Sequence, residues 1–261
     1  MSPQSSDDGQ LQRALASGRF VITAEVTPPV SCNRDDLLAK SLPLKGLADA
    51  VNVTDGAGAR AHMGALASAV VLAQNGIEPV LQLTCRDRNR LALQSDLLGA
   101  ATLGIRNLLM LRGDDPSAGD QPETKPVFDL DSRALIETAV AIRDRGELPS
   151  HRKVTGKAGF FIGAADMPID PPAGWAPKGL KDKIAAGAQF AQTQFCMDIG
   201  VVKRYVARLA QHKLTGKIGI LIGVVPLRSG RSARWIKEHL YGAIIPDEMV
   251  DRLECAGDAA A

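Results

Sequence analysis

The stretch Asn107-Leu-Leu-Met-Leu-Arg-Gly-Asp-Asp-Pro116 runs from an apolar segment straight into charged and turn-forming residues. An apolar run bounded in this way indicates a β-strand that is buried on both faces. Arg112, Asp114 and Asp115 then lie where the strand leaves the core. Ligands of α/β folds bind at the carboxyl ends of the strands, so the stretch predicts the rim of a site. A solvated, glycine-assisted turn is the alternative for a single loop of this kind.

Segments with strand character alternate with segments of helical character along the rest of the chain. This alternation is typical of a parallel sheet with helices outside it. The polar residues that end the strands recur at a regular spacing, which favours a (β/α)8 TIM barrel over an open doubly wound sheet. No G-x-G-x-x-G follows a strand, and this disfavours a Rossmann-type dinucleotide fold. We predict strands in 19–29, 48–56, 78–85, 107–111, 159–165, 190–195 and 218–225, and helices in 35–47, 62–74, 91–103, 131–145, 180–186, 199–212, 232–239 and 247–254.

The number of predicted strands leaves a (β/α)8 barrel one strand short. We therefore expect the last strand and helix of the barrel to be missing from the given chain. We also expect a flexible N-terminus over residues 1–18 and a single barrel domain over residues 19–261. The connection 115–130 is rich in Asp, Gly, Pro and Ser. Loops of this length in compact domains are usually functional or mobile.

Composition and charge exclude several classes of protein. The net charge of +2 gives no electrostatic reason to expect nucleic acid or a membrane as the partner. The four cysteines are scattered without a C-x-x-C pair, and the four histidines have no ligand-type spacing, so we predict neither a metal site nor a disulfide framework. The first residues lack the basic and apolar regions of a signal peptide. We expect a cytoplasmic protein.

Three polar residues near strand ends are candidates for substrate chemistry. Glu25 lies in an apolar, β-branched setting, where burial raises the pKa of a carboxyl group toward that of a general acid. A strand-end carboxylate held by a backbone group or an arginine is the alternative. Asp114 offers two acceptors to an amidine-like edge such as that of a pterin, and Gln194 offers one donor and one acceptor to a similar ring.

Other candidates have structural explanations of equal weight. Thr54 and Thr84 suit the polar fixing of a flat heterocycle, but they also suit the capping of the next helix. Lys181 and Lys183 could bind phosphate or a polyglutamate tail, although a solvated basic helix face is the commoner case. Gln82 lies two residues before Thr84 and shares its face, where we expect core packing.

Several of these segments together resemble the methylenetetrahydrofolate reductase family, in the order that the family has them and across nearly the whole chain. The apolar strand 107–111 and its charged end are the most specific part of the resemblance. The matching pieces are Ala24-Glu-Val-Thr-Pro-Pro29, Val51-Asn-Val-Thr-Asp55, Leu83-Thr-Cys85, Gly104-Ile-Arg-Asn-Leu-Leu-Met-Leu-Arg-Gly-Asp-Asp-Pro116, Lys181-Asp-Lys-Ile-Ala-Ala-Gly-Ala188, Thr193-Gln-Phe195 and Ile245-Pro246.

The resemblance implies a TIM barrel that reduces 5,10-methylenetetrahydrofolate to 5-methyltetrahydrofolate. In this family NADH or NADPH normally reduces a bound FAD, which passes hydride to the folate. Glu25 matches the acid that helps to open the five-membered ring, and Asp114 and Gln194 match positions that recognise the pterin. The positions that match flavin contacts are Thr54, Thr84, Arg112, Gly113 and Lys183.

The chain also departs from the family pattern. The aromatic residue that usually follows the fifth strand and touches the flavin is absent from Gly163-Ala-Ala-Asp166, and an acidic residue before the Lys-x-Lys helix is replaced by Ala176 or Pro177. An aromatic after the seventh strand is replaced by Leu227-Arg-Ser-Gly230. Direct hydride transfer from NADH to folate without flavin therefore stays open. So do a non-catalytic folate- or flavin-binding barrel subunit and the formation of a homo-oligomer.

Overall fold

The computed structural model describes residues 8–256. The described chain divides into two compact units. The first unit comprises the residues up to Ala164 together with Asp182–Phe190, and the second comprises Ala165–Lys181 together with the residues from Ala191 onward. A single barrel domain from residue 19 onward stays a prediction.

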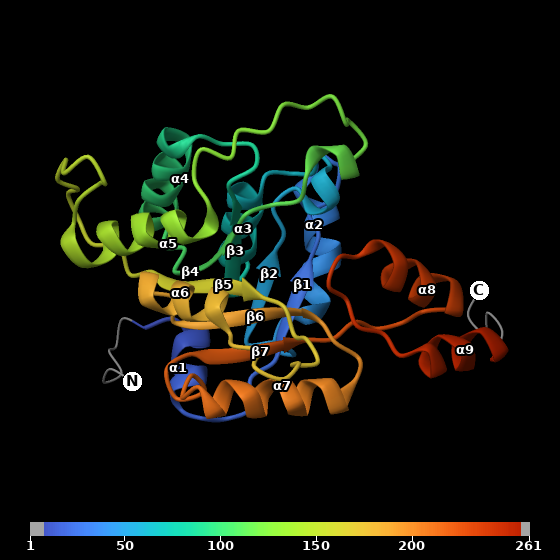
Figure 1. Cartoon of the computed structure of the whole chain (residues 1–261). Helices are drawn as coiled ribbons and strands as arrows, with labels where there is room; N and C mark the ends of the chain where they lie inside the picture. The colour runs from blue at the N-terminus through green and yellow to red at the C-terminus, as the bar shows by residue number, and fades with distance from the viewer. Residues whose placement is uncertain (1–7, 257–261) are drawn as a thin grey trace. The chain divides into compact units, whose positions relative to one another are not determined.

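The first unit is built on parallel strands that follow one another in chain order. Leu81 and Leu83 of β3 and Leu108 of β4 are fully buried, because helices cover the outer face of these strands (Figure 1). Val80 of β3 faces the other side of the sheet and is fully buried as well. This accounts for the near-continuous apolar sequence of β4, which has no solvent-facing side to leave polar. The strands are β1 (Thr23–Val26), β2 (Ala50–Val53), β3 (Pro79–Thr84), β4 (Asn107–Leu111) and β5 (Phe161–Asp166), the last of which belongs to this unit up to Ala164.

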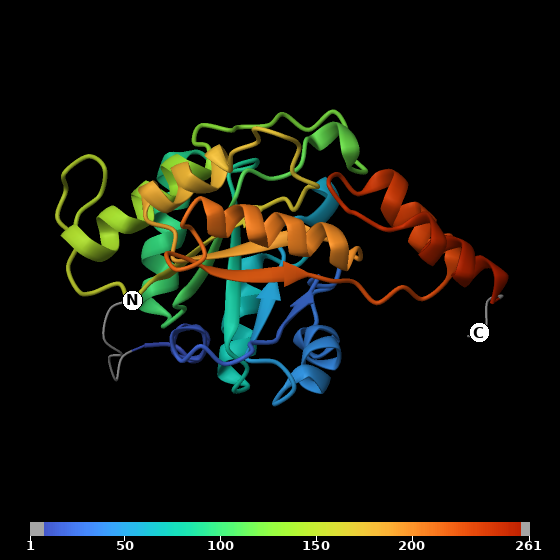
Figure 2. The same ribbon diagram turned by 60° about the horizontal axis from the view of Figure 1, so that its bottom comes forward.

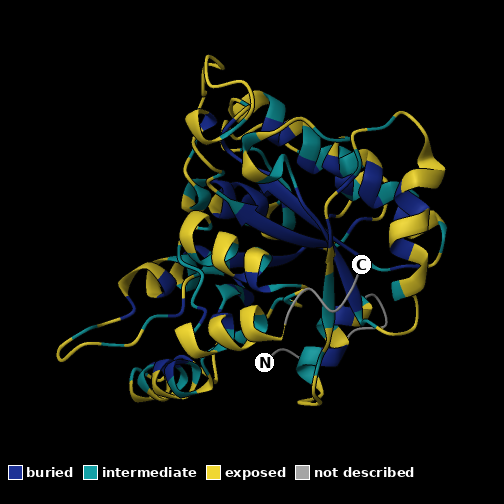
Figure 3. Cartoon of the chain, turned by 90° about the vertical axis from the view of Figure 1, so that its right-hand side faces the viewer, coloured by how far each residue is buried: buried dark blue, intermediate teal, exposed yellow. Residues whose placement is uncertain are grey.

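The helices of the first unit turn apolar stripes toward the strands and polar faces toward solvent (Figure 3). Side chains of Asn33, Asn89 and Asp131 cap three of them by accepting backbone N–H groups of the first turn. The helices are α2 (Arg34–Ser41), α3 (Ala65–Gln74), α4 (Arg90–Thr102) and α5 (Ser132–Val140), which continues as a π-helical turn over Ala141–Arg145; α6 (Lys178–Ala186) belongs to this unit from Asp182. Short 3-10 turns cover Leu42–Leu44, Ala57–Ala59 and Pro116–Ala118.

The N-terminal segment differs from the prediction. Residues Gln10–Ala16 form helix α1 rather than a flexible extension, and Leu11 is fully buried. The carboxylate of Glu78, just before β3, accepts the backbone N–H groups of Gln10 (2.7 Å) and Leu11 (2.9 Å). The expectation of flexibility is therefore wrong for these residues, and its part over residues 1–7 lies outside the described chain.

The second unit contains β6 (Phe190–Phe195, from Ala191), β7 (Gly219–Gly223), α7 (Ile199–Gln211), α8 (Gly230–His239) and α9 (Asp247–Cys255). The backbone N–H of Gly223 donates to the hydroxyl of Thr193 (2.9 Å), which joins β7 to β6. Helices α8 and α9 lie side by side (Figure 2) and enclose a small cluster of Ala233, Ile245 and Val250.

The observed elements bear out the predicted alternation of strands and helices, which is that of a TIM barrel. Residues 8–256 contain seven strands, as predicted, and β6 has the predicted bounds. None of the helices in this part of the chain is both long and apolar enough to cross a membrane.

Gly163 on β5 provides a first test of the packing. A methyl group at this position would lie 2.6 Å from Cε1 of Phe190, whose ring stacks on Phe161 at a centroid distance of 5.0 Å. We expect Gly163→Ala to destabilise the protein by about 1–3 kcal/mol, the usual cost of overpacking a core, measured by urea unfolding. Gly179→Ala is the control, because Gly179 has open space around its Cα and lies in helix α6. That variant is expected to gain up to about 1 kcal/mol from helix propensity, so equal losses in both variants would contradict the packing argument.

Candidate functional site

Glu25, the predicted acid, lies on β1, and its carboxylate Oε2 accepts a hydrogen bond of 3.1 Å from Nε2 of Gln82 on β3. The side chain remains accessible to solvent, yet protein atoms surround it closely enough to remove much of its hydration. This desolvation raises the pKa of Glu25, and the hydrogen bond from Gln82 opposes the rise. A carboxyl group in this state can carry and release a proton closer to neutral pH than a free glutamate can.

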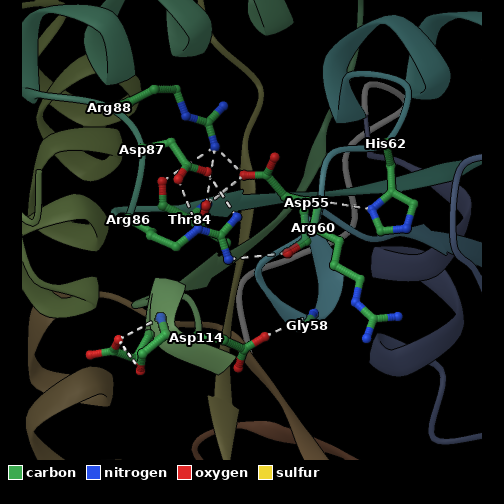
Figure 4. Close-up of polar contacts among 12 residues, drawn as sticks. Asp55, Gly58, Arg60, His62, Thr84, Arg86, Asp87, Arg88 and Asp114 are labelled. Atoms are coloured by element: carbon green, nitrogen blue, oxygen red, sulfur yellow. Dashed lines mark hydrogen bonds and ion pairs between the residues drawn. The ribbon is translucent and has the colours of Figure 1, made fainter. Parts of the chain in front are cut away.

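The loops that follow β2 and β3 are joined by Asp55 (Figure 4). Its Oδ2 accepts the backbone N–H of Thr84 (2.8 Å) and the Thr84 hydroxyl (3.0 Å), and it forms an ion pair with Arg88. Arg88 also bonds Asp96 at 2.9 Å. The hydroxyl of Thr84, predicted to contact flavin, thus already donates within the protein. Charge-assisted bonds of this kind fix the geometry of both strand ends.

Arg86 supports the turn that follows β2. Its side chain is almost fully buried, pairs with Asp87 through two bonds of 2.8 Å, and donates from Nη1 to the carbonyl of Gly56 (3.1 Å). Gly56 and Gly58 both have positive φ, at 59° and 63°. Glycine is the residue that adopts such φ values without strain, so the tight turn over Arg86 needs glycine at these positions.

Asp114, predicted to recognise the pterin, lies at the rim of this arrangement (Figure 4). Its Oδ2 accepts the backbone N–H of Gly58 at 3.0 Å, and the side chain is exposed. Gly113 has a φ of 91° and packs against Thr84 and Arg86. The carboxylate of Asp114 is therefore held by one oxygen while its other face points to open space.

The connection 115–130, predicted to be functional or mobile, is fastened at both ends. Asp115 caps a 3-10 turn, and the backbone N–H groups of Val127 and Phe128 donate to the carbonyls of Arg86 (2.7 Å) and Cys85 (3.2 Å). The guanidinium of Arg112, another predicted flavin contact, lies 4.4 Å from the centroid of the Phe128 ring. The end of the loop therefore covers the carboxyl ends of β3 and β4.

Thr54 and Asn52 carry buried polar atoms that lack a partner. Oγ1 of Thr54 and Oδ1 of Asn52 are both fully enclosed and form no hydrogen bond within the described chain. Buried polar groups are almost always satisfied by protein, water or ligand. Thr54 is a predicted cofactor contact, and its enclosed hydroxyl can meet a flavin only if the surrounding side chains move.

Two of the predicted site residues, Lys183 and Gln194, are not at the ends of β1 to β4. Lys183 lies on α6 and is half-buried. Gln194 lies on β6 in the second unit, where Nε2 donates to the carbonyl of Tyr241 (3.1 Å) and Oε1 accepts the backbone N–H of Phe195 (2.9 Å). The amide keeps one further N–H donor and one further lone pair, which a ligand could use. In the same unit the hydroxyl of Tyr205 donates to Asp166, at the end of β5.

The first unit thus brings together Glu25, Thr54, Thr84, Arg112, Gly113 and Asp114 at the carboxyl ends of β1 to β4. The sequence interpretation expected core packing for Gln82, which instead bonds Glu25, and did not identify the anchoring contacts of Asp55, Arg86 and Arg88. The period-two spacing of Gln82 and Thr84 was the available signal for Gln82. Within residues 8–256, no group of three or more His, Cys, Asp or Glu side chains is arranged to hold a metal ion.

Solved structures similar to this chain share its fold at low sequence identity. A 2,3-dimethylmalate lyase structure aligns with a TM-score of 0.52 and 14% identity, over 97% of this chain and 85% of the other. A tryptophan synthase structure from M. tuberculosis aligns with a TM-score of 0.51 and 14% identity, over 96% and 97%. These similarities confirm the predicted TIM-barrel type of fold.

Curated relatives are similar at 27–28% identity. The 5,10-methylenetetrahydrofolate reductase of Pectobacterium carotovorum is 28% identical over 227 residues, which cover 83% of this chain and 68% of the relative. A probable methylenetetrahydrofolate reductase (NADPH) of Caenorhabditis elegans is 27% identical over 183 residues, or 69% of this chain, and the matched part is 25% of the worm protein. The family model described as Methylenetetrahydrofolate reductase matches residues 10–261. The resemblance seen in the sequence is thereby confirmed, and the chain belongs to the methylenetetrahydrofolate reductase family.

Proposed function

We propose that this protein reduces 5,10-methylenetetrahydrofolate to 5-methyltetrahydrofolate with NADH or NADPH as the hydride donor. The observation that carries the proposal is Glu25, a desolvated and hydrogen-bonded carboxyl group at the strand ends of a chain of this family. A module that only binds folate has no need of such an acid.

Glu25 would supply the proton of the reaction. The substrate carries its methylene carbon between two nitrogen atoms of a five-membered ring. Cleavage of one carbon–nitrogen bond places a proton on the leaving nitrogen and leaves an iminium carbon, which then accepts hydride. A general acid works best when its pKa is near the working pH, and desolvation moves the pKa of Glu25 in that direction.

Asp114 would hold the pterin. One of its oxygens is occupied by the N–H of Gly58, which fixes the carboxylate, and the exposed side can accept the paired N–H donors of the ring. Gln194 would add its second N–H donor and the second lone pair of its oxygen. Both assignments are part of the proposal.

The residues of the first unit suit a bound FAD in several respects. Arg112 is exposed with one face on Phe128, and Gly113 next to it leaves the strand end without a side chain, whereas the enclosed hydroxyl of Thr54 would need local movement to reach the flavin. We assign Thr54, Thr84, Arg112, Gly113 and Lys183 to holding the flavin. When bound, FAD would accept hydride from the nicotinamide and deliver it to the folate.

An absorbance spectrum of the purified protein between 350 and 500 nm tests the cofactor. We expect a flavin double band that NADH or NADPH bleaches and methylenetetrahydrofolate restores. A flat trace with intact NADH-dependent turnover would instead establish direct transfer from NADH to the folate. Two observations favour that second candidate: Asp55 already engages Thr84, and Asp166, in the segment where relatives have a flavin-contacting aromatic, is engaged by Tyr205.

A third outcome would identify a non-catalytic subunit. In that case the protein would bind folate or flavin, yet no turnover would be seen with either nicotinamide donor. The assay therefore separates the two reductase mechanisms from a binding protein.

A further inference from the structure

The hydrogen bond between Glu25 and Gln82 joins two strands that are not neighbours in the sheet. Glu25 is on β1 and Gln82 is on β3, and β2 lies between these two strands. Neighbouring strands are about 4.8 Å apart, so strands on either side of a third lie about 10 Å apart. A bond of 3.1 Å between the two side chains therefore requires them to reach toward each other across the face of β2.

Asn52 lies on that face of β2. It is the register partner of Glu25, and paired residues of neighbouring strands present their side chains on the same side of the sheet. Val51 and Val53, on the opposite face, are fully buried in the core. The register places Asn52 level with Glu25 and places Gln82 two residues beyond Val80, the partner of Asn52 on β3. The Glu25 side chain therefore starts beside Asn52 and reaches from there toward Gln82.

The side chain of Asn52 is only half satisfied. It is 1% exposed, and Nδ2 donates to the carbonyl of Ala24 at 3.2 Å. This bond orients the amide and leaves Oδ1 as the acceptor, and Oδ1 has no partner in the described chain. A buried carbonyl oxygen without a donor is costly, and an ionised carboxylate cannot supply one. A protonated carboxyl group can.

We propose that Asn52 and Gln82 are positioning residues that control the proton of Glu25, each by stabilising one of its two protonation states. The amide N–H of Gln82 donates to Oε2 and stabilises the ionised carboxylate. Oδ1 of Asn52 accepts the hydrogen bond of the protonated carboxyl group and stabilises the acid. The bond from Gln82 lets Glu25 release its proton during turnover, and the unpaired Oδ1 of Asn52 then favours recovery of the proton afterwards. This inference rests on the proposed reductase function for its role in turnover, although the protonation itself does not.

Desolvation and the bond from Gln82 shift the pKa of Glu25, and no charged side chain of the described residues contributes to that shift. Charged side chains on the loops after β2 to β4, on α2 and before β2 are engaged with other partners. Asp55 pairs with Arg88, Arg86 with Asp87, Asp114 accepts from Gly58, Lys40 donates to the carbonyl of Thr27, and Asp49, before β2, pairs with Arg19.

The proposal predicts opposite pKa shifts for the two substitutions. Gln82→Met removes the donor to the ionised form, so the pKa of Glu25 should rise. Asn52→Val removes the acceptor of the protonated form, so the pKa should fall by about half a unit to one unit, the shift expected from one ordinary hydrogen bond. The fall is diagnostic, because the added apolar surface of valine alone would raise the pKa.

The measurement is a carbon-13 NMR titration of the full chain labelled at glutamate carboxyl carbons, with the Glu25 signal identified by its loss in Glu25→Gln. Asn52→Thr is the matched control, because threonine has the shape of valine but keeps an oxygen on the same face. Its pKa should lie between those of the wild type and Asn52→Val. The alkaline limb of kcat should move in the same directions as the pKa.

Shifts of the same sign in Asn52→Val and Gln82→Met, or no shift in Asn52→Val, would overturn the proposal. If Asn52→Val does not fold, the decision passes to Asn52→Thr, where a fall supports the proposal and a rise or no change refutes it. The titration needs no substrate. Absent turnover in the wild type would therefore refute the proposed function alone, while the NMR result would still decide the roles of Asn52 and Gln82.

Discussion

Replacing Glu25 by glutamine is expected to lower kcat for methylenetetrahydrofolate reduction by about 10²–10⁴-fold, the range that a general acid contributes. Glutamine has the same shape and retains an oxygen that can accept the hydrogen bond from Gln82. Folate binding and the melting temperature should therefore change little. Steady-state turnover, folate binding by calorimetry and thermal unfolding, measured on the same preparation, separate the loss of the proton from a loss of structure.

Glu137→Gln is the matched control for this variant. Glu137 is an exposed glutamate on α5 that pairs with Arg133, away from the strand ends. Its substitution should leave turnover unchanged. Wild-type turnover in Glu25→Gln would refute the assignment of the acid. A loss of turnover accompanied by a loss of folate binding would show that Glu25 binds the substrate rather than donating a proton.

Replacing Asp55 by alanine is expected to cause the largest loss of stability, about 2–3 kcal/mol. The substitution removes the acceptor of three hydrogen bonds, from the N–H and hydroxyl of Thr84 and from Arg88. The side chains of Arg88 and Asp55 are 22% and 14% exposed, so the guanidinium left behind is largely desolvated. Asp96 still pairs with Arg88 after the substitution, so the loss comes chiefly from the N–H and hydroxyl of Thr84, which are left without their acceptor.

Asp129→Ala provides the contrast for Asp55→Ala in urea unfolding. Asp129 also pairs with an arginine, Arg90, but the Arg90 side chain is 58% exposed. Water replaces the lost partner at such a site, so the free energy of unfolding should change far less than in Asp55→Ala. Equal effects of the two substitutions would show that burial does not determine the contribution of the Asp55 network.

The sequence predicted the order of strands and helices well because each element carries its own local signal. The apolar run of β4 ends in charged residues, and β6 has its predicted bounds Phe190 and Phe195. Helix α1 was missed because its stabilising contacts are distant in sequence. It has no side-chain cap of its own, and Glu78 supplies the cap from the start of β3.

The position of the site could be predicted from the sequence, but the hydrogen-bond partners of its residues could not. Strand ends that carry Glu25, Thr84 and Asp114 could be read from the sequence, since parallel strands bring their carboxyl ends to one edge. The sequence could not show that Asp55 accepts a hydrogen bond from the hydroxyl of Thr84. Nor could it show that Gln82 donates a hydrogen bond to Glu25 rather than packing in the core. Pairing among polar side chains depends on loop geometry that no periodicity encodes.

The cap that Glu78 provides for α1 also constrains the order of folding. Helix α1 has only seven residues, well below the ~12–15 at which an isolated helix becomes even marginally stable in water. The contact that completes it spans 68 positions of the chain. During synthesis on the ribosome, α1 therefore emerges before β3 but can become helical only after β3 has been made. The order in which these two segments are made is thus not the order in which they acquire their native structure.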